Sequence, residues 1–366
     1  MKLIYDVVHG HIGVNSDDLT FIDNLWMKRL KRVKQLGLLD HIFPNASHTR
    51  FEHSLGVYHL ADEYINYFEK NSHTKLFSEK EKRCVKLAGL YHDIGHGPFS
   101  HVFDNEIINN YSLTDDMYLH ESRSKWIVEE IFREQQPSGF NGYDIELIKD
   151  LIEPNKTKKE KPYLFQIINN KQTGLDIDKF DYMMRDNYHL GLDYNITPQR
   201  IFLKSKINPE TKNINYHFSI ASNIFNVYSN RYKLYREVYC HQTVKTIETM
   251  LADAMKQYEP LESMLTKDNF IKLDDSIYTN ILFSDCQSSK SILERIEKRD
   301  LYNTIYFGNV SDSPCLSKRT VDFTLNFCNQ ERNPMLNVPF YGKEGFIYNE
   351  LLPDKFENKL RLVLET

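Results

Sequence analysis

Apolar residues recur at three- and four-residue spacing over the first two thirds of the chain, which is the period of a helix that buries one face. This spacing predicts one amphipathic helix from Asp17 to Gly37 and a second from Arg50 to Phe68. Ser78 and Glu81 have the spacing of an N-terminal capping box, so a third helix is expected to begin there and to end or bend at Gly95 and Gly97. The same pattern predicts helices near 119–134, 144–153, 162–170, 176–187, 197–202 and 221–258.

In two places the helical spacing gives way to an alternation of apolar and polar residues, which is typical of strands. Residues 201–220 hold two alternating runs around a turn that contains proline, asparagine and lysine, which predicts a β-hairpin. After Pro260, helices are expected at 268–283 and 288–299, followed by short strands at TIYFGNV, TVDFTLNFC, VPFYG and GFIYN. The prediction is a mainly α fold, with a helical core that includes the hairpin over residues 1–260 and a mixed α+β C-terminal lobe over residues 261–366.

Composition narrows the class of protein. The 41% hydrophobic and 27% charged content of the 366 residues is ordinary for a globular chain. No apolar run reaches the roughly 18 residues of a membrane span, so no membrane partner is expected. The formal net charge of −5 lacks the basic excess typical of phosphate-backbone binding, which leaves nucleic acid only a local patch. Five scattered cysteines without CxxC spacing, and a poor signal peptide, predict a cytoplasmic or nuclear protein.

Histidines are concentrated in one part of the chain, since eleven of the fourteen lie between His9 and His120. His92 and its neighbour Asp93 project about 100° apart on a helix, so near a helix end both side chains can reach one ion. His53 and Asp178 complete a set of two imidazoles and two carboxylates from two other helices, with coordination positions left for water. A divalent cation in such an open site lowers the pKa of bound water and polarises a phosphoryl oxygen.

The residues around this set fit a site that handles phosphate. Gly95 and Gly97 allow close backbone approach, and Arg50 lies three residues before His53 on the same helical face. The strings SHTRFEHSLGV, AGLYHDIGHGPFSHVFD and GLDIDKFDYMMRD resemble the motifs of the HD-domain superfamily of metal-dependent phosphohydrolases. More narrowly they resemble the SAM-and-HD-domain deoxynucleoside triphosphate triphosphohydrolase family, and the likeness runs from IYDVVHGHI to LLPDKFENKLRLV. We expect an HD-domain helical core without the SAM domain.

The resemblance implies an activity and a set of site residues. Family members cleave a deoxynucleoside triphosphate (dNTP) to the deoxynucleoside and inorganic triphosphate. The implied metal ligands are His53, His92, Asp93 and Asp178, for Fe, Mn, Zn or Mg without distinction, and Mg²⁺ accompanies the nucleotide. The implied phosphate partners are Arg50, His96, Lys179 and Arg231.

The resemblance also implies residues for proton transfer and for sugar selection. His101, supported by Asp104, would protonate the leaving 5′ oxygen, and His120 is the alternative. The 3′-hydroxyl would bond to Gln35 and Asp186, while the 2′ side would be crowded by Leu36, Tyr182 and Tyr239. A ribose hydroxyl buried there without a partner would cost about 1–3 kcal/mol.

Departures from the family concern regulation. Its members form tetramers when nucleotides bind at subunit interfaces, so a homo-oligomer, dimer or tetramer, is expected. Asp23, Arg299 and Lys343 match the guanine-selective effector site, whereas Lys28 and Lys31 replace a glutamine and an arginine. Further differences occur at Tyr5, His217, Ser219, Tyr235 and Gln242. Activation by GTP is therefore not expected.

Two other functions are compatible with the sequence. One keeps the metal chemistry but acts on another nucleotide as a phosphohydrolase or phosphodiesterase. The other is a non-catalytic oligomer that binds nucleotides or nucleic acid, for which residues 228–236 offer interleaved aromatic and basic side chains. The complete set of ligands and phosphate cations favours the enzyme, because a decayed site would have lost some of them.

Overall fold

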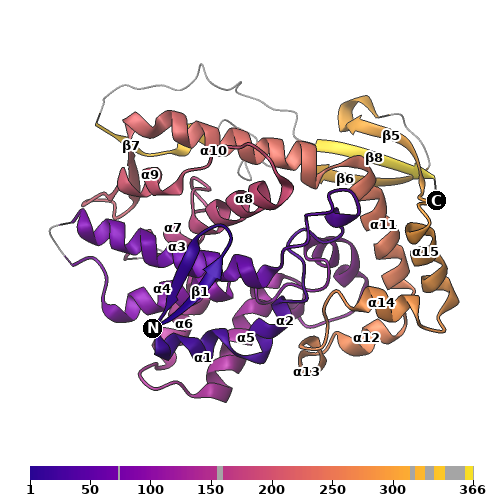
Figure 1. Ribbon diagram of the computed structural model, residues 1–366, viewed down its shortest axis with the longest axis horizontal. Coiled ribbons are helices and arrows are strands. Elements are labelled where there is room, and N and C mark those ends of the chain that lie inside the picture. The colour runs from indigo at the N-terminus through magenta and orange to yellow at the C-terminus, as the bar shows by residue number, and fades with distance from the viewer. Residues whose placement is uncertain (73–74, 155–159, 314–317, 326–333, 343–358, 366) are drawn as a thin grey trace.

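A computed structural model describes residues 1–72, 75–154, 160–313, 318–325, 334–342 and 359–365 (Figure 1). Its α-helices are α1 (Leu19–Ile22), α2 (Leu25–Leu30), α3 (Arg50–Lys70), α4 (Glu79–Tyr91), α5 (His120–Gln135), α6 (Gly142–Ile152), α7 (Pro162–Ile168), α8 (Ile177–Leu190), α9 (Pro198–Leu203), α10 (Ala221–Lys233), α11 (Gln242–Lys256), α12 (Pro260–Met264), α13 (Lys267–Phe270), α14 (Ile277–Leu282) and α15 (Gln287–Glu297). The strands are β1 (Lys2–Asp6), β2 (Gly10–Val14), β3 (Ser205–Ile207), β4 (Ile214–His217), β5 (Asn303–Asn309), β6 (Arg319–Thr324), β7 (Phe340–Tyr341) and β8 (Lys359–Glu365). The prediction of a mainly α fold is confirmed.

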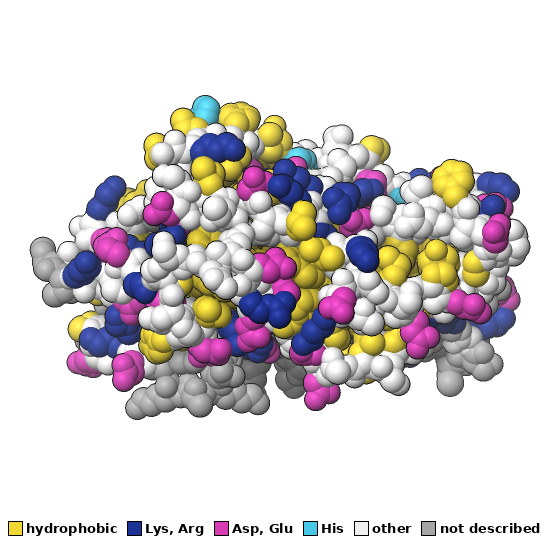
Figure 2. All heavy atoms as spheres, turned by 90° about the horizontal axis from the view of Figure 1, so that it is seen from below, with side chains coloured by type: hydrophobic (Ala, Val, Ile, Leu, Met, Phe, Trp, Pro, Cys, Tyr) yellow, Lys and Arg dark blue, Asp and Glu magenta, His cyan; other side chains and the backbone are white. Residues whose placement is uncertain are grey.

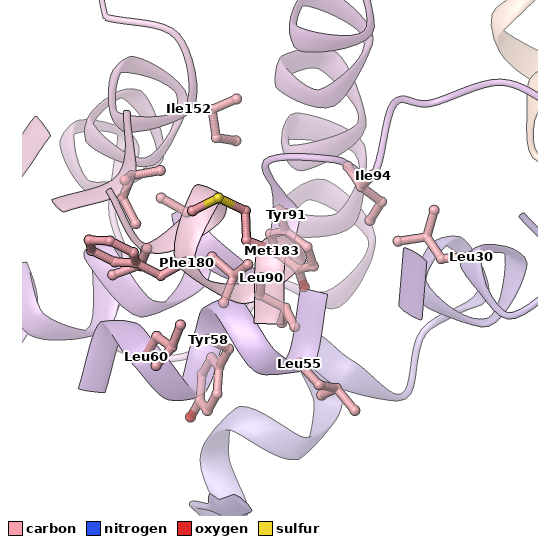
Figure 3. Close-up of a cluster of buried hydrophobic side chains, with 14 of the residues drawn as sticks. Leu30, Leu55, Tyr58, Leu60, Leu90, Tyr91, Ile94, Ile152, Phe180 and Met183 are labelled. Carbon is pink, nitrogen blue, oxygen red and sulfur yellow. The ribbon is translucent and has the colours of Figure 1, made fainter. Parts of the chain in front are cut away.

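Helices α3, α4 and α8 form the centre of the helical core. Capping boxes start the first two of these helices, Thr49 with Glu52 on α3 and Ser78 with Glu81 on α4. The apolar faces of the three helices meet in the cluster of Figure 3, whose labelled members include Leu55, Tyr58, Leu60, Leu90, Tyr91, Phe180 and Met183. Since α3 contacts both α4 and α8, polar residues at their facing positions are brought close together.

The three sheets of the described residues are small, and their strands come from segments of the chain outside α3, α4 and α8. Strands β1 and β2 form an antiparallel hairpin that contacts α3, which the sequence analysis did not predict. Strands β3 and β4 form the predicted hairpin, and β7 pairs in parallel with β4. The third sheet has the order β5-β8-β6, with β8 antiparallel to both neighbours, beside α11 and α15 in Figure 1.

Three predicted helices are interrupted in the structure. The predicted helix 17–37 breaks at Asn24, whose side chain accepts a hydrogen bond from Met27 N–H and starts α2, and α2 ends at Leu30. The predicted helix 221–258 is interrupted between α10 and α11, where residues 234–239 are wound as π-helix. The predicted helix 268–283 is interrupted by a turn between α13 and α14. In each case the apolar spacing continues through the break, so it does not reveal where the helix is interrupted.

Part of the predicted C-terminal lobe lies outside the described residues, namely the strand at GFIYN and the end of TVDFTLNFC. Among the described residues, the helices are all too short or too polar to cross a membrane. On the face seen in Figure 2, basic and acidic side chains are interspersed over the described surface, in keeping with the small net charge.

Candidate active site

Two imidazoles and two carboxylates converge where α3, the end of α4 and the start of α8 meet. His53 Nε2 lies 3.2 Å from His92 Nε2 and 3.3 Å from Asp178 Oδ1. Asp93 lies 3.5 Å from His53 Nε2 and 3.4 Å from His92 Nε2. The structure thus brings together all four residues that the sequence analysis named as ligands of a divalent cation.

Partners on the outer side of each imidazole set its tautomer. His92 Nδ1 donates to the carbonyl oxygen of Gly89 at 2.8 Å, and His53 Nδ1 lies 2.7 Å from Asp181 Oδ2. Both bonds leave Nε2 as the free ring nitrogen, which is the arrangement found in metal-ligating histidines. Two unprotonated Nε2 atoms at 3.2 Å face each other with their lone pairs, so a cation or a proton is needed between them.

The pKa shifts in this cluster have the signature of a cation site. Burial would lower the pKa of His53, but Asp178 and Asp181 outweigh it and raise the pKa to about 10. The pKa of His92 is also raised, because Asp93 and Asp178 outweigh its burial. The pKa of Asp93 falls well below its usual value despite burial, through His92 and Arg50. A buried set that favours charged carboxylates and protonated imidazoles is stabilised by positive charge, so the residues fit a divalent cation.

Asp181 ties this cluster to the N-terminal hairpin, and the sequence analysis missed it. Its carboxylate accepts hydrogen bonds from His53, from His9 at 2.6 Å, and from Arg185 at 3.0 and 3.1 Å. Arg185 in turn donates to Asp6 at 2.8 Å. Asp181 lies three residues after Asp178 on α8, and this spacing was the available signal.

The predicted phosphate partners surround the cluster. Arg50 is buried, pairs with Asp93 and donates from Nε to Ser100 Oγ at 2.8 Å. His96 Nε2 lies 3.5 Å from Asp93, on the other side of that carboxylate. Lys179 Nζ lies 2.8 Å from Asp176 and 3.8 Å from Asp178.

Arg231 is buried, and its charge opposes protonation of Lys179, which places the two cations near each other. The pKa of Lys179 is nevertheless raised, because Asp176 and Asp178 outweigh burial and Arg231.

The candidate proton donors form a stacked group beside Asp104. The rings of His96 and His120 stack at 3.9 Å, and His101 meets His96 edge-on at 5.0 Å. Asp104 lies 3.3 Å from His96 Nδ1, and its charge favours protonation of His101, so the expected support of His101 by Asp104 stays a prediction. The other ion pairs of Asp104 are with Arg123 and with His120 Nδ1, which lies 3.0 Å away. This pairing raises the pKa of His120 against the effect of burial.

A cavity of about 700 Å³ adjoins the cluster. Arg50 and His101 line it, and so do all five predicted sugar residues, Gln35, Leu36, Tyr182, Asp186 and Tyr239. Asp186 is buried and accepts hydrogen bonds from Tyr239 and from His48, at 2.7 Å in the latter case. His48 was not predicted, although it lies two residues before Arg50 in the same motif.

The predicted effector residues make separate contacts. Asp23 and Lys28 form a mostly exposed ion pair at 2.7 Å, and Lys31 lies over the ring of Phe51 at 4.5 Å. Arg299 donates to the carbonyl oxygen of His41. Lys343 lies outside the described residues. These contacts leave the predicted effector site untested.

Comparison with known proteins identifies the family. Residues 50–188 match the HD domain, and residues 228–325 match the HD-associated region. The human deoxynucleoside triphosphate triphosphohydrolase SAMHD1 is 30% identical over 98% of this chain and 70% of its own length. The chain belongs to the SAMHD1 family of HD-domain proteins. All four candidate metal ligands lie within the HD-domain match.

Two further proteins show comparable similarity to this chain. A Dictyostelium discoideum protein named as a SAMHD1 homolog is 34% identical over 83% of this chain, which spans 60% of that relative's length. A putative HD domain-containing protein of Acanthamoeba polyphaga mimivirus is 31% identical over 93% of this chain and 85% of its own length.

Proposed function

We propose that the protein is a metal-dependent triphosphohydrolase that cleaves a dNTP to the deoxynucleoside and inorganic triphosphate. The observation that supports this most is the juxtaposition of the His53, His92, Asp93 and Asp178 cluster with the cavity lined by Arg50, His101 and the five sugar residues. Relatives of 30% to 34% identity carry the name of this activity.

In the proposed complex the cluster residues hold a divalent cation, and Mg²⁺ accompanies the nucleotide. When bound, the cation supplies an activated water and neutralises phosphate charge. Fixed positive charge for the triphosphate comes from Arg50, Lys179 and Arg231. The attraction between these charges and the phosphate oxygens strengthens as negative charge develops in the transition state. Arg50 and Arg231 are buried, and the side chain of Lys179 is 15% exposed. Because little water screens these charges, their attraction for phosphate is strong.

His101 faces the cavity and is the proposed proton donor to the 5′ oxygen as its bond to the α-phosphorus breaks. His101 is exposed at the cavity, yet the partial loss of hydration there, together with the positive charges of His96, Arg50 and His120, holds its pKa well below the usual value. The negative charge of a bound triphosphate opposes that effect, so proton uptake accompanies substrate binding, and the imidazolium then donates its proton to the leaving oxygen.

The sugar residues account for the proposed selectivity. Asp186 already accepts from Tyr239 and His48, so it is held as an acceptor for a 3′-hydroxyl at the cavity wall. Leu36 and Tyr182 line the same cavity and leave a 2′-hydroxyl without a partner. A loss of a few kcal/mol corresponds to a preference of about 100-fold for dATP over ATP in kcat/KM.

The test is to incubate the purified protein with Mn²⁺ or Mg²⁺ and each dNTP or ribonucleotide, and to detect inorganic triphosphate. The double variant His92→Ala with Asp93→Ala is expected to lose bound metal and activity. The variant His11→Ala with Asp17→Ala removes the same two side-chain types from the surface and serves as control. Release of pyrophosphate or of a monophosphate would instead favour another nucleotide phosphohydrolase, and full turnover by the His92 and Asp93 variant would exclude the proposed metal site.

Homo-oligomer formation and independence from GTP stay predictions. A lysine at position 28 or 31 offers donors only, without the acceptor of a glutamine or the planar fork of an arginine. We expect one of two results. Either a standing oligomer is active constitutively, with the same sedimentation and dATP hydrolysis with and without GTP, or nucleotides activate it without a preference for guanine. Strict dependence of sedimentation and dATP hydrolysis on GTP would show that these lysines read guanine in another way.

A further inference from the structure

One carboxylate from the turn between α13 and α14 binds the backbone of two distant segments. Asp275 Oδ2 accepts a hydrogen bond from Lys34 N–H at 2.8 Å, and Asp275 Oδ1 accepts one from Phe99 N–H at 2.7 Å. The N–H of Asp275 donates to the carbonyl oxygen of Arg32 at 3.1 Å. A single side chain therefore connects the segments at Lys34 and Phe99, which are more than sixty residues apart in sequence.

The two segments carry opposite parts of the proposed substrate site. Lys34 directly precedes Gln35 and Leu36, which are sugar residues. Phe99 lies two residues before His101, the proposed proton donor, and all of these except Lys34 line the cavity. The two hydrogen bonds to Asp275 therefore help to fix the separation between the residues proposed to contact the sugar and the proposed proton donor.

The backbone at this point needs external support. Phe99 and Ser100 have φ values of 56° and 59°, a left-handed conformation that side chains with a Cβ adopt only where surroundings hold them. Gly37 has φ of 55°, and a Cβ there would lie 3.1 Å from the carbonyl oxygen of Phe99. Ser100 Oγ donates to the carbonyl oxygen of Lys34 at 2.8 Å while it accepts from Arg50. Asp275 thus holds the strained backbone at Phe99 and Ser100 next to the segment that contains Lys34.

We infer that Asp275 is a positioning residue for the proposed reaction, which sets the distance between the residues that hold the sugar and the residue that protonates the leaving group. This inference rests on the proposed function. It assigns to the HD-associated region, residues 228–325, a part in shaping the HD-domain site. A carboxylate is needed because it presents two acceptor oxygens, whereas an amide presents one acceptor and turns its NH₂ toward the other N–H.

The experiment compares Asp275→Asn with Asp268→Asn, an exposed aspartate on the adjacent α13, in the full chain with metal bound. Four quantities are measured: amide hydrogen exchange in peptides that contain Lys34 and Phe99, bound metal, the affinity for an α,β-imido analogue of dATP, and kcat/KM for dATP and ATP. Asp275→Asn is expected to speed exchange in both peptides, to weaken analogue binding at least fivefold, and to lower kcat/KM for dATP at least tenfold with a smaller dATP-to-ATP ratio. Bound metal and all values for Asp268→Asn should stay unchanged.

The outcomes separate this inference from the proposed function. Faster exchange with unchanged analogue affinity and an unchanged dATP-to-ATP ratio would reduce Asp275 to a structural role and overturn the inference. Losses of analogue affinity and of kcat/KM in proportion to a loss of bound metal would also overturn the inference. If the unsubstituted protein releases no triphosphate, the proposed function has failed, and analogue affinity alone decides the inference. Asp275→Glu keeps the charge but moves the oxygens by one methylene, so it should change the same quantities in the same direction if the asparagine variant does not fold.

Discussion

At the scale of single residues, the candidate site is a set of buried charges that support one another. His53, His92 and Asp93 would each be costly to bury alone, but together with the partly exposed Asp178 they are stabilised by opposite charge. Asp181 and Gly89 hold the two imidazoles from behind. These hydrogen bonds hold both rings with Nε2 directed into the cluster.

His101 and His120 are distinguished by what they face, because His101 lines the cavity and His120 pairs with Asp104. We predict that His101→Ala lowers kcat for dATP by about 100- to 10,000-fold, the range for loss of a general acid. His120→Ala should keep more activity than His101→Ala. Steady-state kinetics with equal bound metal in both variants checks this, and a greater loss in His120→Ala would make His120 the proton donor.

Asp275 predicts a pH dependence of stability. Burial raises its pKa to about 6, although the N–H groups of Lys34 and Phe99 and the charge of Lys34 oppose this effect. Asp275 thus binds its proton more tightly in the folded protein than in the unfolded chain. The contribution of this protonation to the free energy of unfolding is complete below about pH 4 and is lost as pH rises through about 6. The free energy of unfolding of the unsubstituted protein, minus that of Asp275→Asn, should fall by up to about 1.4 kcal/mol per pH unit in this window. Urea unfolding at pH 4.5, 5.5 and 6.5 measures it, and a difference that rises with pH would contradict the assignment.

At the scale of elements, the contact between α3 and α8 sets the site. A Cβ at Gly56 on α3 would lie 1.8 Å from Asp181 Oδ1 and 2.5 Å from Arg185 Nη2, so only glycine lets α8 approach this closely. The approach is what brings Asp181 to His53 and Asp178 to the other ligands.

Gly56→Ala is therefore predicted to separate α3 from α8, to lower the free energy of unfolding by about 1–3 kcal/mol as overpacking does, and to weaken metal binding. Gly142→Ala is the matched control, since nothing lies within 4 Å of a Cβ at Gly142 near the start of α6. Urea unfolding and metal content measure both effects. Equal free energies of unfolding and equal metal contents in the two variants would show that the position of α8 does not depend on the close approach at Gly56.

At the scale of the whole molecule, the end of the chain contributes to the candidate site. Strand β8 is central in its sheet, and its neighbour β6 supplies Val321, Asp322 and Phe323 to the cavity wall. Arg361 on β8 donates two hydrogen bonds of 2.7 Å to Asp322. The wall of the cavity thus depends on pairing between segments that are distant in sequence.

Leu362 is fully buried on β8. Leu362→Ala should lower the free energy of unfolding by about 2–5 kcal/mol through loss of apolar burial and the resulting cavity. It should also raise KM for dATP, because β6 loses its support. Glu365→Gln on the same strand is exposed and should leave both quantities unchanged. An unaltered KM in a destabilised Leu362→Ala protein would separate the sheet from the substrate site.

The sequence by itself determined the helices whose signals are local. Apolar spacing predicts α3, and apolar spacing with a capping box predicts α4. The His53, His92, Asp93 and Asp178 set follows from the three motifs quoted above. These features could be predicted because a helix face and its cap depend on residues three or four positions apart. The boundary at residue 260 and the cytoplasmic or nuclear location stay predictions.

Only the tertiary structure decided the features that depend on distant partners. The apolar spacing of residues 268–283 predicts one helix, yet Asp275 interrupts it to bind Lys34 and Phe99. Asp181 orients His53, which is far from it in the sequence. Strand β8 pairs with β5 and β6, which precede it by many residues. Local pattern shows which side of an element is buried, whereas the partner that covers it is selected by the packing of the whole chain.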